Sequence, residues 1–250
     1  MAARGEMVNF TPSPWGGRIR LPRLFFTVTL GLCLAAAVTA GWNIFAIQTG
    51  YSVSRAEYEA LQAKYAPIAE GAPAETAADL ALTNVNPDYI GWLCIKDSSM
   101  DYPVVQGQDN EKYLSVTFMG ENGRAGAIFM DYRCEGGFDS PYAVVYGHNA
   151  GDGTMFAELN RYAEPAWREE HPDITVTVPS GAELSYRVFS VQDTDVGDAA
   201  YQLDFADRPA VEEHFARLGA QRGTKILTLS TCADSGGKNA RLLVHAARVD

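Results

Sequence analysis

Basic side chains are scarce in this sequence of 250 residues. Lysine and arginine together number 20, against 31 aspartates and glutamates, which gives a formal net charge of -11 at pH 7. A protein that binds nucleic acid needs a basic surface to neutralise phosphate groups. The charge balance therefore argues against nucleic acid as a partner, although it does not identify a substrate.

Cysteine is also scarce, and the four cysteines, Cys33, Cys94, Cys134 and Cys232, lie far apart. The sequence contains no C-x-x-C or H-x-x-x-H pair, so no zinc or other metal site is expected. Four cysteines in a chain of this length do not indicate a disulfide framework. A single bond between Cys94 and Cys134 stays open as an alternative.

Charged residues are absent from Leu24 to Ser54. Within this stretch, Leu24–Ile47 is long enough to cross a bilayer, which takes about 20 apolar residues. A cleaved signal peptide is the alternative, because Val38-Thr39-Ala40 resembles a small-residue cleavage site. The apolar run continues beyond that point, and we therefore expect a membrane anchor over residues 24–47 that contacts lipid.

The charges around the apolar stretch predict its orientation. Three arginines precede it, at positions 18, 20 and 23. The positive-inside tendency places such residues in the cytoplasm. We therefore expect a single-pass membrane protein, with residues 1–23 cytoplasmic and the chain after about residue 50 outside the cell.

Residues 48–83 are expected to form a juxtamembrane helix followed by a linker. Ser54-Arg55-Ala56-Glu57 fits a capping box at a helix start, and apolar side chains follow at helical spacing over residues 58–65. Residues 66–83 are rich in Ala, Pro and Glu. We interpret that composition as a spacer with partial helical character.

From Asn84 to the end, short apolar segments alternate with turns rich in Gly, Asn, Asp and Pro. This sequence pattern is typical of a mainly β domain, either a barrel or a sandwich. The expected strands are Ile90–Ile95, Tyr102–Gln106, Ala127–Met130, Tyr142–Tyr146, Ile174–Val178, Leu184–Gln192, Lys225–Thr231 and Leu242–Val249.

One helix is expected to interrupt the strands, over residues 207–220. Asp207 can cap it and Pro209 lies in its first turn. An apolar stripe follows at Val211, Phe215 and Leu218. Glycine at position 223 is expected to help end the region.

The last two expected strands place a thiol opposite a guanidinium. If they form an antiparallel hairpin around the loop Ala233–Ala240, Cys232 and Arg241 stand at the same end of the sheet. A cysteine attacks as its thiolate, and a neighbouring cation or histidine raises the thiolate fraction. Arg241 cannot act as a base, because guanidinium stays protonated. Its expected role is to hold the substrate and stabilise an oxyanion.

Proton transfer then needs one of the four histidines. His148 follows the apolar segment AVVYG and opens a loop, so it too stands at a strand end and is the best candidate. His171 is expected in a surface loop, and His214 at the solvent edge of the helix. His245 shares a strand with Arg241, but four strand residues span about 13 Å. We therefore expect it to lie well away from the end of the sheet that carries the thiol. Each signal is weak alone; their joint occurrence at strand ends favours a nucleophilic site.

The residues around these side chains resemble a known family. Thr228–Cys232 followed by Arg241 resembles the TL-x-TC…R signature of sortases, the membrane-anchored cysteine transpeptidases of Gram-positive bacteria. Tyr146–Asn149, with Thr154–Phe156 just after, resembles the histidine segment of class B sortases. Further similar segments are Asn86–Ile95, Asp101–Leu114, Gly126–Arg133 and the helix at 207–220. The resemblance covers the chain from residue 84 to the end.

This resemblance implies a closed eight-stranded β-barrel over residues 84–250 and a reaction without metal or organic cofactor. Cys232 would attack the carbonyl of a threonine in the C-terminal sorting motif of a surface protein, giving a thioester, while His148 protonates the departing amine. An amine of a peptidoglycan cross-bridge, or of its lipid-linked precursor, would then resolve the thioester. Arg241 would steady the oxyanion in both steps.

Position within the family's pattern also suggests Asn110, Leu114 and Ser230 as substrate contacts. Asp234 has a counterpart in some relatives, but we interpret it as a turn residue.

Three alternatives stay open. A cysteine peptidase would use the same residues and let water resolve the thioester. An anchored binding module would carry an inactive barrel. A pilin-polymerising sortase would use a lysine acceptor, and it commonly carries a lid segment and a second membrane span, neither of which we recognise here. We therefore favour cell-wall anchoring.

Overall fold

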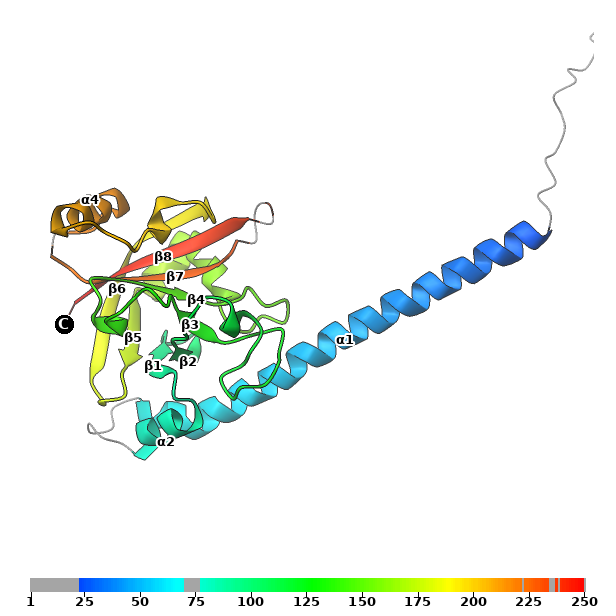
Figure 1. The fold of residues 1–250 in the computed structure, drawn as a ribbon, viewed down its shortest axis with the longest axis horizontal. Helices are drawn as coiled ribbons and strands as arrows, with labels where there is room; N and C mark the ends of the chain where they lie inside the picture. Colours follow the sequence, from blue (N-terminus) through cyan, green and yellow to red (C-terminus); the bar gives the residue numbers. More distant parts are fainter. Residues whose placement is uncertain (1–22, 70–76, 222, 234–236, 238, 250) are drawn as a thin grey trace, which may run out of the picture. The chain divides into compact units, whose positions relative to one another are not determined.

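The structure is a computed structural model that describes residues 23–69, 77–221, 223–233, 237 and 239–249 (Figure 1). The chain divides into two compact units, Met1–Ala46 and Ile47–Asp250. The predicted cytoplasmic segment lies almost entirely outside the described residues, as does part of the predicted linker.

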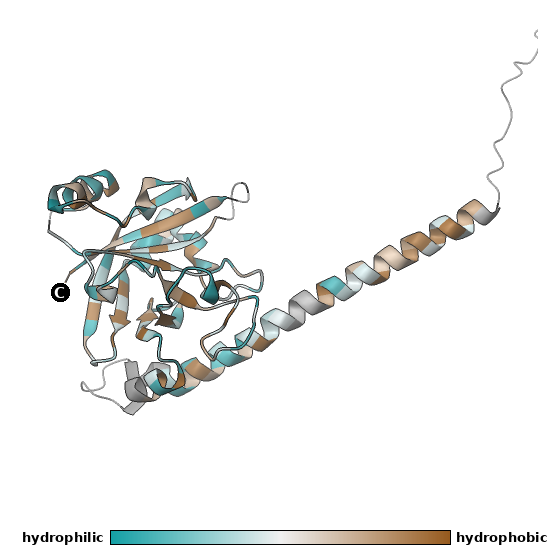
Figure 2. Cartoon of the chain, in the orientation of Figure 1, coloured by the Kyte–Doolittle hydropathy of each residue, from teal (hydrophilic) through white to brown (hydrophobic). Residues whose placement is uncertain are grey.

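One long helix, α1 (Arg23–Ala69), carries the predicted anchor. Its apolar side chains between Phe25 and Phe45 are exposed. The hydropathy colouring in Figure 2 shows that this part of α1 is largely hydrophobic. The helix is long and apolar enough to cross a membrane, a test that an anchor and a signal sequence both meet. The predicted capping box at Ser54 is wrong, because α1 continues through it and the Ser54 hydroxyl donates to the Gly50 carbonyl (3.3 Å). The chain before Ser54 is already helical, so no helix begins there.

Eight strands close into a barrel in the order β1-β2-β3-β4-β7-β8-β6-β5, which confirms the mainly β prediction. The pairs β2–β3 and β4–β7 are parallel, and the other neighbours are antiparallel. The strands are β1 (Tyr89–Cys94), β2 (Asp101–Val105), β3 (Ile128–Met130), β4 (Tyr142–Tyr146), β5 (Asp173–Thr177), β6 (Glu183–Asp195), β7 (Ile226–Cys232) and β8 (Ala240–Arg248).

The remaining helices are short. The helix α2 (Ala77–Val85) precedes β1, and the helices between strands are η1 (Lys112–Leu114), η2 (Gly137–Asp139), η3 (Glu158–Ala163), α3 (Pro165–Glu170), η4 (Ala199–Tyr201) and α4 (Arg208–Leu218). As expected, α4 lies between β6 and the cysteine strand β7. Asp207 caps it by accepting from the Ala210 backbone (3.0 Å). The helix ends at Gly219, whose φ of +85° suits glycine, and not at Gly223.

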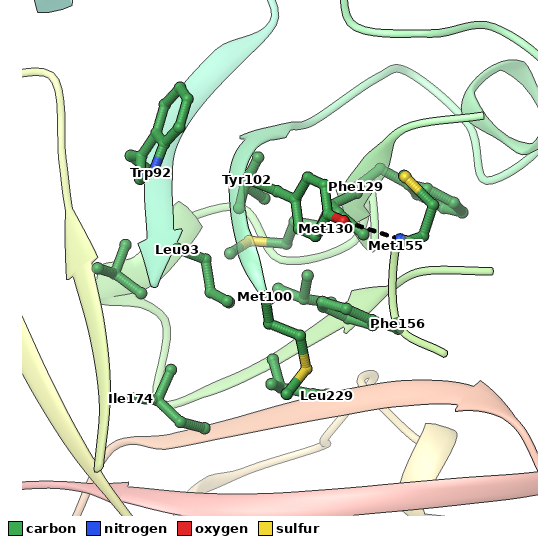
Figure 3. Packing of buried hydrophobic residues seen from close by; sticks show 14 of the residues in the cluster. Trp92, Leu93, Met100, Tyr102, Phe129, Met130, Met155, Phe156, Ile174 and Leu229 are labelled. Atoms are coloured by element: carbon green, nitrogen blue, oxygen red, sulfur yellow. Dashed lines mark hydrogen bonds between the residues drawn. The ribbon is translucent and has the colours of Figure 1, made fainter. Parts of the chain in front are cut away.

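Large apolar side chains form one buried cluster around the strands of the barrel, among them Trp92, Leu93, Met130 and Phe156 (Figure 3). Each such side chain stabilises the fold by about 1.5–3 kcal/mol when fully buried. The Tyr102 hydroxyl accepts a hydrogen bond from the Met155 backbone (3.0 Å), which fixes the loop after β4 to the core (Figure 3).

The C-terminal part of α1 belongs to this core. Tyr58, Leu61 and Tyr65 are at most 7% exposed and lie in the barrel's apolar cluster. The Tyr58 hydroxyl donates to the Gly126 carbonyl (2.7 Å) and accepts from the Phe118 backbone (3.2 Å). The predicted juxtamembrane helix is therefore part of the same compact unit as the barrel.

Two histidine predictions are wrong. His171 is 8% exposed, because its ring stacks on Trp167 with centroids 3.5 Å apart and its nitrogens contact the carbonyls of Trp167 and Asp97. His214 is 3% exposed and packs between the rings of Tyr142 and Phe205.

No disulfide bond joins Cys94 to Cys134, two of the described residues. Cys134 is buried, and burial raises the pKa of its thiol to about 11. The Cys134 Sγ lies 3.8 Å from the Tyr142 carbonyl, to which it donates a weak hydrogen bond.

Candidate active site

A cavity of about 380 Å³ opens where β4 and β7 end and β8 begins. All six residues singled out from the sequence line it: Asn110, Leu114, His148, Ser230, Cys232 and Arg241. The structure thus brings together residues that are up to 131 positions apart in the chain (241 − 110). Such a concave site, with a few polar groups in an apolar lining, is typical of a ligand-binding or active site.

Cys232 is the residue at which β7 leaves the core. Residues 226–231 are buried, and Cys232 is the exposed end of the strand. It pairs with Arg241, the second residue of β8, as the predicted hairpin requires. The Arg241 Nη1 atom donates to the Ala240 carbonyl (2.9 Å), which holds the guanidinium beside the strand.

The backbone of Cys232 is tied to two neighbouring segments. The side-chain amides of Asn149 and Asn160 both donate to the Cys232 carbonyl, at 3.1 and 3.4 Å. Because Asn149 follows His148 directly, the first of these bonds links the histidine loop to the end of β7.

The parallel pairing of β4 with β7 places His148 at the same end as the thiol. Tyr146 pairs with Ser230, and the Gly147 backbone donates to the Ser230 carbonyl (3.1 Å). His148 is two residues beyond Tyr146, as Cys232 is beyond Ser230. A parallel register therefore brings the imidazole and the thiol to one rim of the barrel.

The ring of His148 is oriented by the backbone at Leu114. Its Nε2 atom lies 2.8 Å from the Leu114 carbonyl oxygen. A carbonyl can only accept, so Nε2 carries the proton in this contact, and Nδ1 is the basic nitrogen of the neutral ring. The Leu114 side chain is 46% exposed at the rim.

Only glycine fits at position 147, between the strand and His148. A Cβ atom there would lie 2.5 Å from Phe156 Cγ and 2.6 Å from Ile128 Cδ1. These contacts are too short for any side chain. The close approach sets the path by which the chain delivers His148 to the cavity.

The predicted substrate contacts Asn110 and Ser230 lie in a hydrogen-bonded wall. Asn110 donates to the Asp131 carboxylate (2.9 Å), and its side-chain oxygen accepts from the Tyr132 backbone (3.1 Å). The Ser230 hydroxyl lies 2.8 Å from the hydroxyl of Tyr201.

Several lining residues were not singled out from the sequence. Arg133 and Tyr146 lie within segments that resemble the family, and nothing local marks Arg133 as a cavity residue. Val196 and Tyr201 come from the connection between β6 and α4, whose path the sequence pattern does not specify. An aromatic residue ending a strand, such as Tyr146, is the one signal that could have been used.

The described residues contain no group of three or more His, Cys, Asp or Glu side chains that could hold a metal ion. Asp234 lies outside them. The chemistry available at the cavity is that of a thiol, an imidazole and a guanidinium. Together they can supply a nucleophile, a proton carrier and a fixed positive donor for an oxyanion.

Comparisons with known proteins agree with this chemistry. The family described as the sortase domain matches residues 93–249. Sortase B of Staphylococcus aureus is 28% identical over 236 residues, which cover 90% of this chain and 96% of that protein. Sortase B of Listeria monocytogenes is 33% identical over 162 residues, which cover 60% of this chain and 65% of that protein.

A solved structure, the Staphylococcus aureus sortase B–substrate complex, superposes with a TM-score of 0.71 and 28% sequence identity. The match covers 81% of this chain and 99% of the solved one. The chain therefore belongs to the sortase family of cysteine transpeptidases and resembles its class B members in both sequence and fold.

Proposed function

We propose that this sortase cleaves a C-terminal sorting motif after threonine and transfers the surface protein to a cell-wall amine. The observation that carries the proposal is the single cavity lined by Cys232, His148 and Arg241. The acceptor amine belongs to a peptidoglycan cross-bridge or to its lipid-linked precursor.

In the first step the Cys232 thiolate attacks the threonine carbonyl carbon. The thiol proton passes to Nδ1 of His148, since Nε2 is held by Leu114. The tetrahedral oxyanion is stabilised by Arg241, a contribution of about 10²–10³ in kcat for one oxyanion donor. The C–N bond then breaks, His148 protonates the leaving amine, and a thioester remains on Cys232.

In the second step the acceptor amine attacks the thioester carbonyl. His148 takes a proton from the amine, Arg241 stabilises the second oxyanion, and the Cys232 thiolate leaves. The products are a new amide bond and the regenerated enzyme. No step needs a metal or an organic cofactor.

We place the catalytic unit outside the cell, tethered by the apolar part of α1. The exposed apolar residues between Phe25 and Phe45 support an anchor in membrane lipid. The arginines at 18, 20 and 23 support a cytoplasmic N-terminus.

A panel of threonine-containing sorting peptides, incubated with enzyme and an amine acceptor, tests the proposal. Product mass distinguishes the ligated peptide from the hydrolysed one, and therefore a transpeptidase from a cysteine peptidase. A lysine-containing peptide as acceptor tests the pilin-polymerising alternative. Cys232→Ala is expected to release no product. Hydrolysis alone, unchanged by any amine, would contradict the transfer step.

A further inference from the structure

A buried carboxylate stands behind the wall of the cavity. Asp131 follows β3 directly, and its side chain is 0% exposed. It accepts hydrogen bonds from three residues that line the cavity: Asn110 Nδ2 (2.9 Å), Tyr146 Oη (2.8 Å) and both Nε and Nη2 of Arg133 (2.9 Å each). Among the ion pairs of the described residues, only the pair of Asp131 with Arg133 has a carboxylate side chain that is fully buried.

The partners of Asp131 are held in one orientation each. The amide of Asn110 is fixed from both ends, because its oxygen also accepts from the Tyr132 backbone (3.1 Å). The Arg133 fork is bidentate on the carboxylate, an arrangement that sets direction as well as strength. The Tyr146 ring is held against Phe129, with centroids 5.2 Å apart.

The network continues across the cavity to the cysteine strand. Arg133 Nη2 also donates to the Tyr201 carbonyl (3.2 Å), and the rings of Tyr146 and Tyr201 stack with centroids 6.2 Å apart. The Tyr201 hydroxyl in turn contacts Ser230 Oγ (2.8 Å), two residues before the nucleophile. One carboxylate therefore fixes a wall that reaches from Asn110 to Ser230.

The charge of Asp131 also affects the positive charge that the cavity offers to a substrate. Two guanidinium groups line it, those of Arg133 and Arg241. Burial by itself would raise the pKa of Asp131, but the hydrogen bonds from Arg133, Tyr146 and Asn110 outweigh it and hold that pKa below its usual value. The ionised carboxylate neutralises Arg133 and leaves Arg241 as the cation available to an oxyanion.

A buried ion pair of this kind is weak evidence for stability, because desolvation offsets much of the attraction. The ion pair can instead serve binding, because it orders the side chains of the cavity wall before the substrate arrives. Such ordering lowers the entropic cost of binding. We propose that Asp131 is a positioning residue of the transpeptidase, which fixes Asn110, Arg133 and Tyr146 for binding of the sorting peptide. This inference rests on the proposed function.

The test compares Asp131→Asn with wild type, using the full chain in detergent and the sorting peptide that wild type turns over best. The substitution keeps the size of the side chain and removes its charge. We expect KM for the peptide to rise about tenfold or more, with kcat changed by no more than about threefold, as for lost ground-state binding. Alkylation of Cys232 by iodoacetamide should stay within about twofold of wild type, since the thiol is not a partner of Asp131.

Asp139→Asn is the matched control. Asp139 also pairs with cations, Lys225 and Arg248, but its side chain is 78% exposed and does not line the cavity. Its loss should leave KM within about twofold of wild type. A general effect of removing an ion-paired carboxylate would appear in both variants.

Two further substitutions extend the test, and the first of them keeps the inference testable if Asp131→Asn folds poorly. Tyr146→Phe retains the ring and removes one hydrogen bond to Asp131, and it should raise KM about threefold or more. Asn110→Ala should raise KM in wild type and have less than half that effect in Asp131→Asn, because partners in one network are not additive.

The inference is overturned if folded Asp131→Asn has a wild-type KM. It is also overturned if the rise in KM of the double variant equals the product of the rises caused by Asp131→Asn and Asn110→Ala alone. It is also overturned if Asp131→Asn is unfolded and Tyr146→Phe has a wild-type KM. If wild type turns over no peptide and forms no thioester, the proposed function fails, and the inference falls with it. Turnover by wild type with an unchanged KM in the variants leaves the proposed function standing.

Discussion

At the residue scale, Gly147 controls how His148 reaches the cavity. Gly147→Ala would put a Cβ atom within 2.6 Å of both Phe156 and Ile128. Overpacking of this kind costs about 1–3 kcal/mol. We therefore expect a lower free energy of unfolding in denaturant and a lower kcat, because the strand end carrying His148 must shift.

Gly151→Ala is the control for that substitution. Gly151 lies in the same loop, but no atom is within 4 Å of a Cβ built on it. Its replacement should change neither stability nor kcat measurably. Equal effects at the two glycines would show that the close packing at position 147 does not position the histidine.

Arg241 is predicted to act on the oxyanion and not on the thiol. Arg241→Gln should lower kcat by about 10²–10³, the range for loss of one oxyanion donor. Arg187→Gln is the control, because Arg187 is 62% exposed and pairs with Asp173 on the neighbouring strand. Steady-state kinetics of peptide transfer provides the measurement. A kcat within threefold of wild type for Arg241→Gln would remove the residue from the mechanism.

Strand-end residues could be predicted from the sequence, whereas buried polar ones could not. Cys232 and Arg241 follow from two apolar segments and a loop, since a hairpin leaves their junctions at one end. His171 and His214 were misplaced because charged neighbours in sequence say nothing about the rings that pack on them. Asp131 was missed for a similar reason, since two of its three side-chain partners, Asn110 and Tyr146, come from other segments of the chain.

At the element scale, α4 and β8 each bury a histidine. His245 is 0% exposed, with Nδ1 2.8 Å from the Thr228 hydroxyl. Burial, followed by repulsion from His214, lowers the pKa of His245 to about 4. Burial also lowers the pKa of His214.

These pKa shifts predict that acid destabilises the barrel. The unfolded chain, with an ordinary histidine pKa of about 6.5, binds more protons than the folded chain between pH 6.5 and 4. Stability from neutral His245 is therefore full above pH 6.5 and lost as pH falls toward 4, by about 3 kcal/mol in total. Urea unfolding at several pH values measures this loss.

His245→Asn supplies the comparison, because its amide can occupy the place of Nδ1 beside Thr228 without titrating. The variant should lose less stability than wild type between pH 6.5 and 4. Identical pH dependence in the two proteins would show that His245 is not held neutral by burial.

Helices and strands were predicted correctly where the local sequence pattern determines them. All eight strands appear within a few residues of their expected bounds, and Asp207 caps α4. The start of the juxtamembrane helix was wrong because a capping motif acts only where the chain turns, and here the preceding residues are already helical. The choice between barrel and sandwich depends on contacts between distant strands, and the family resemblance decided it.

At the scale of the whole molecule, α1 has two roles along its length. Its N-terminal part exposes apolar residues, and its C-terminal part buries Tyr58, Leu61 and Tyr65 in the barrel unit. A chain beginning at Ile47 should therefore remain folded and leave the membrane fraction. A chain beginning at Asn84 should be much less stable, since each lost side chain contributes about 1.5–3 kcal/mol.

Membrane fractionation and thermal unfolding of the two truncated chains check this prediction. Equal melting temperatures would mean that the C-terminal part of α1 does not stabilise the barrel. Sedimentation of the chain from Ile47 with membranes, in the absence of detergent, would contradict an anchor confined to the apolar stretch.

The central claim is that Cys232 carries the acyl group between donor and acceptor. Intact-protein mass spectrometry during turnover of a sorting peptide, without an acceptor amine, tests it most directly. We predict an adduct with the mass of the peptide's N-terminal fragment, located on Cys232, removed by hydroxylamine and absent from Cys232→Ala. Turnover with no such adduct, or an adduct that persists in Cys232→Ala, would contradict the account.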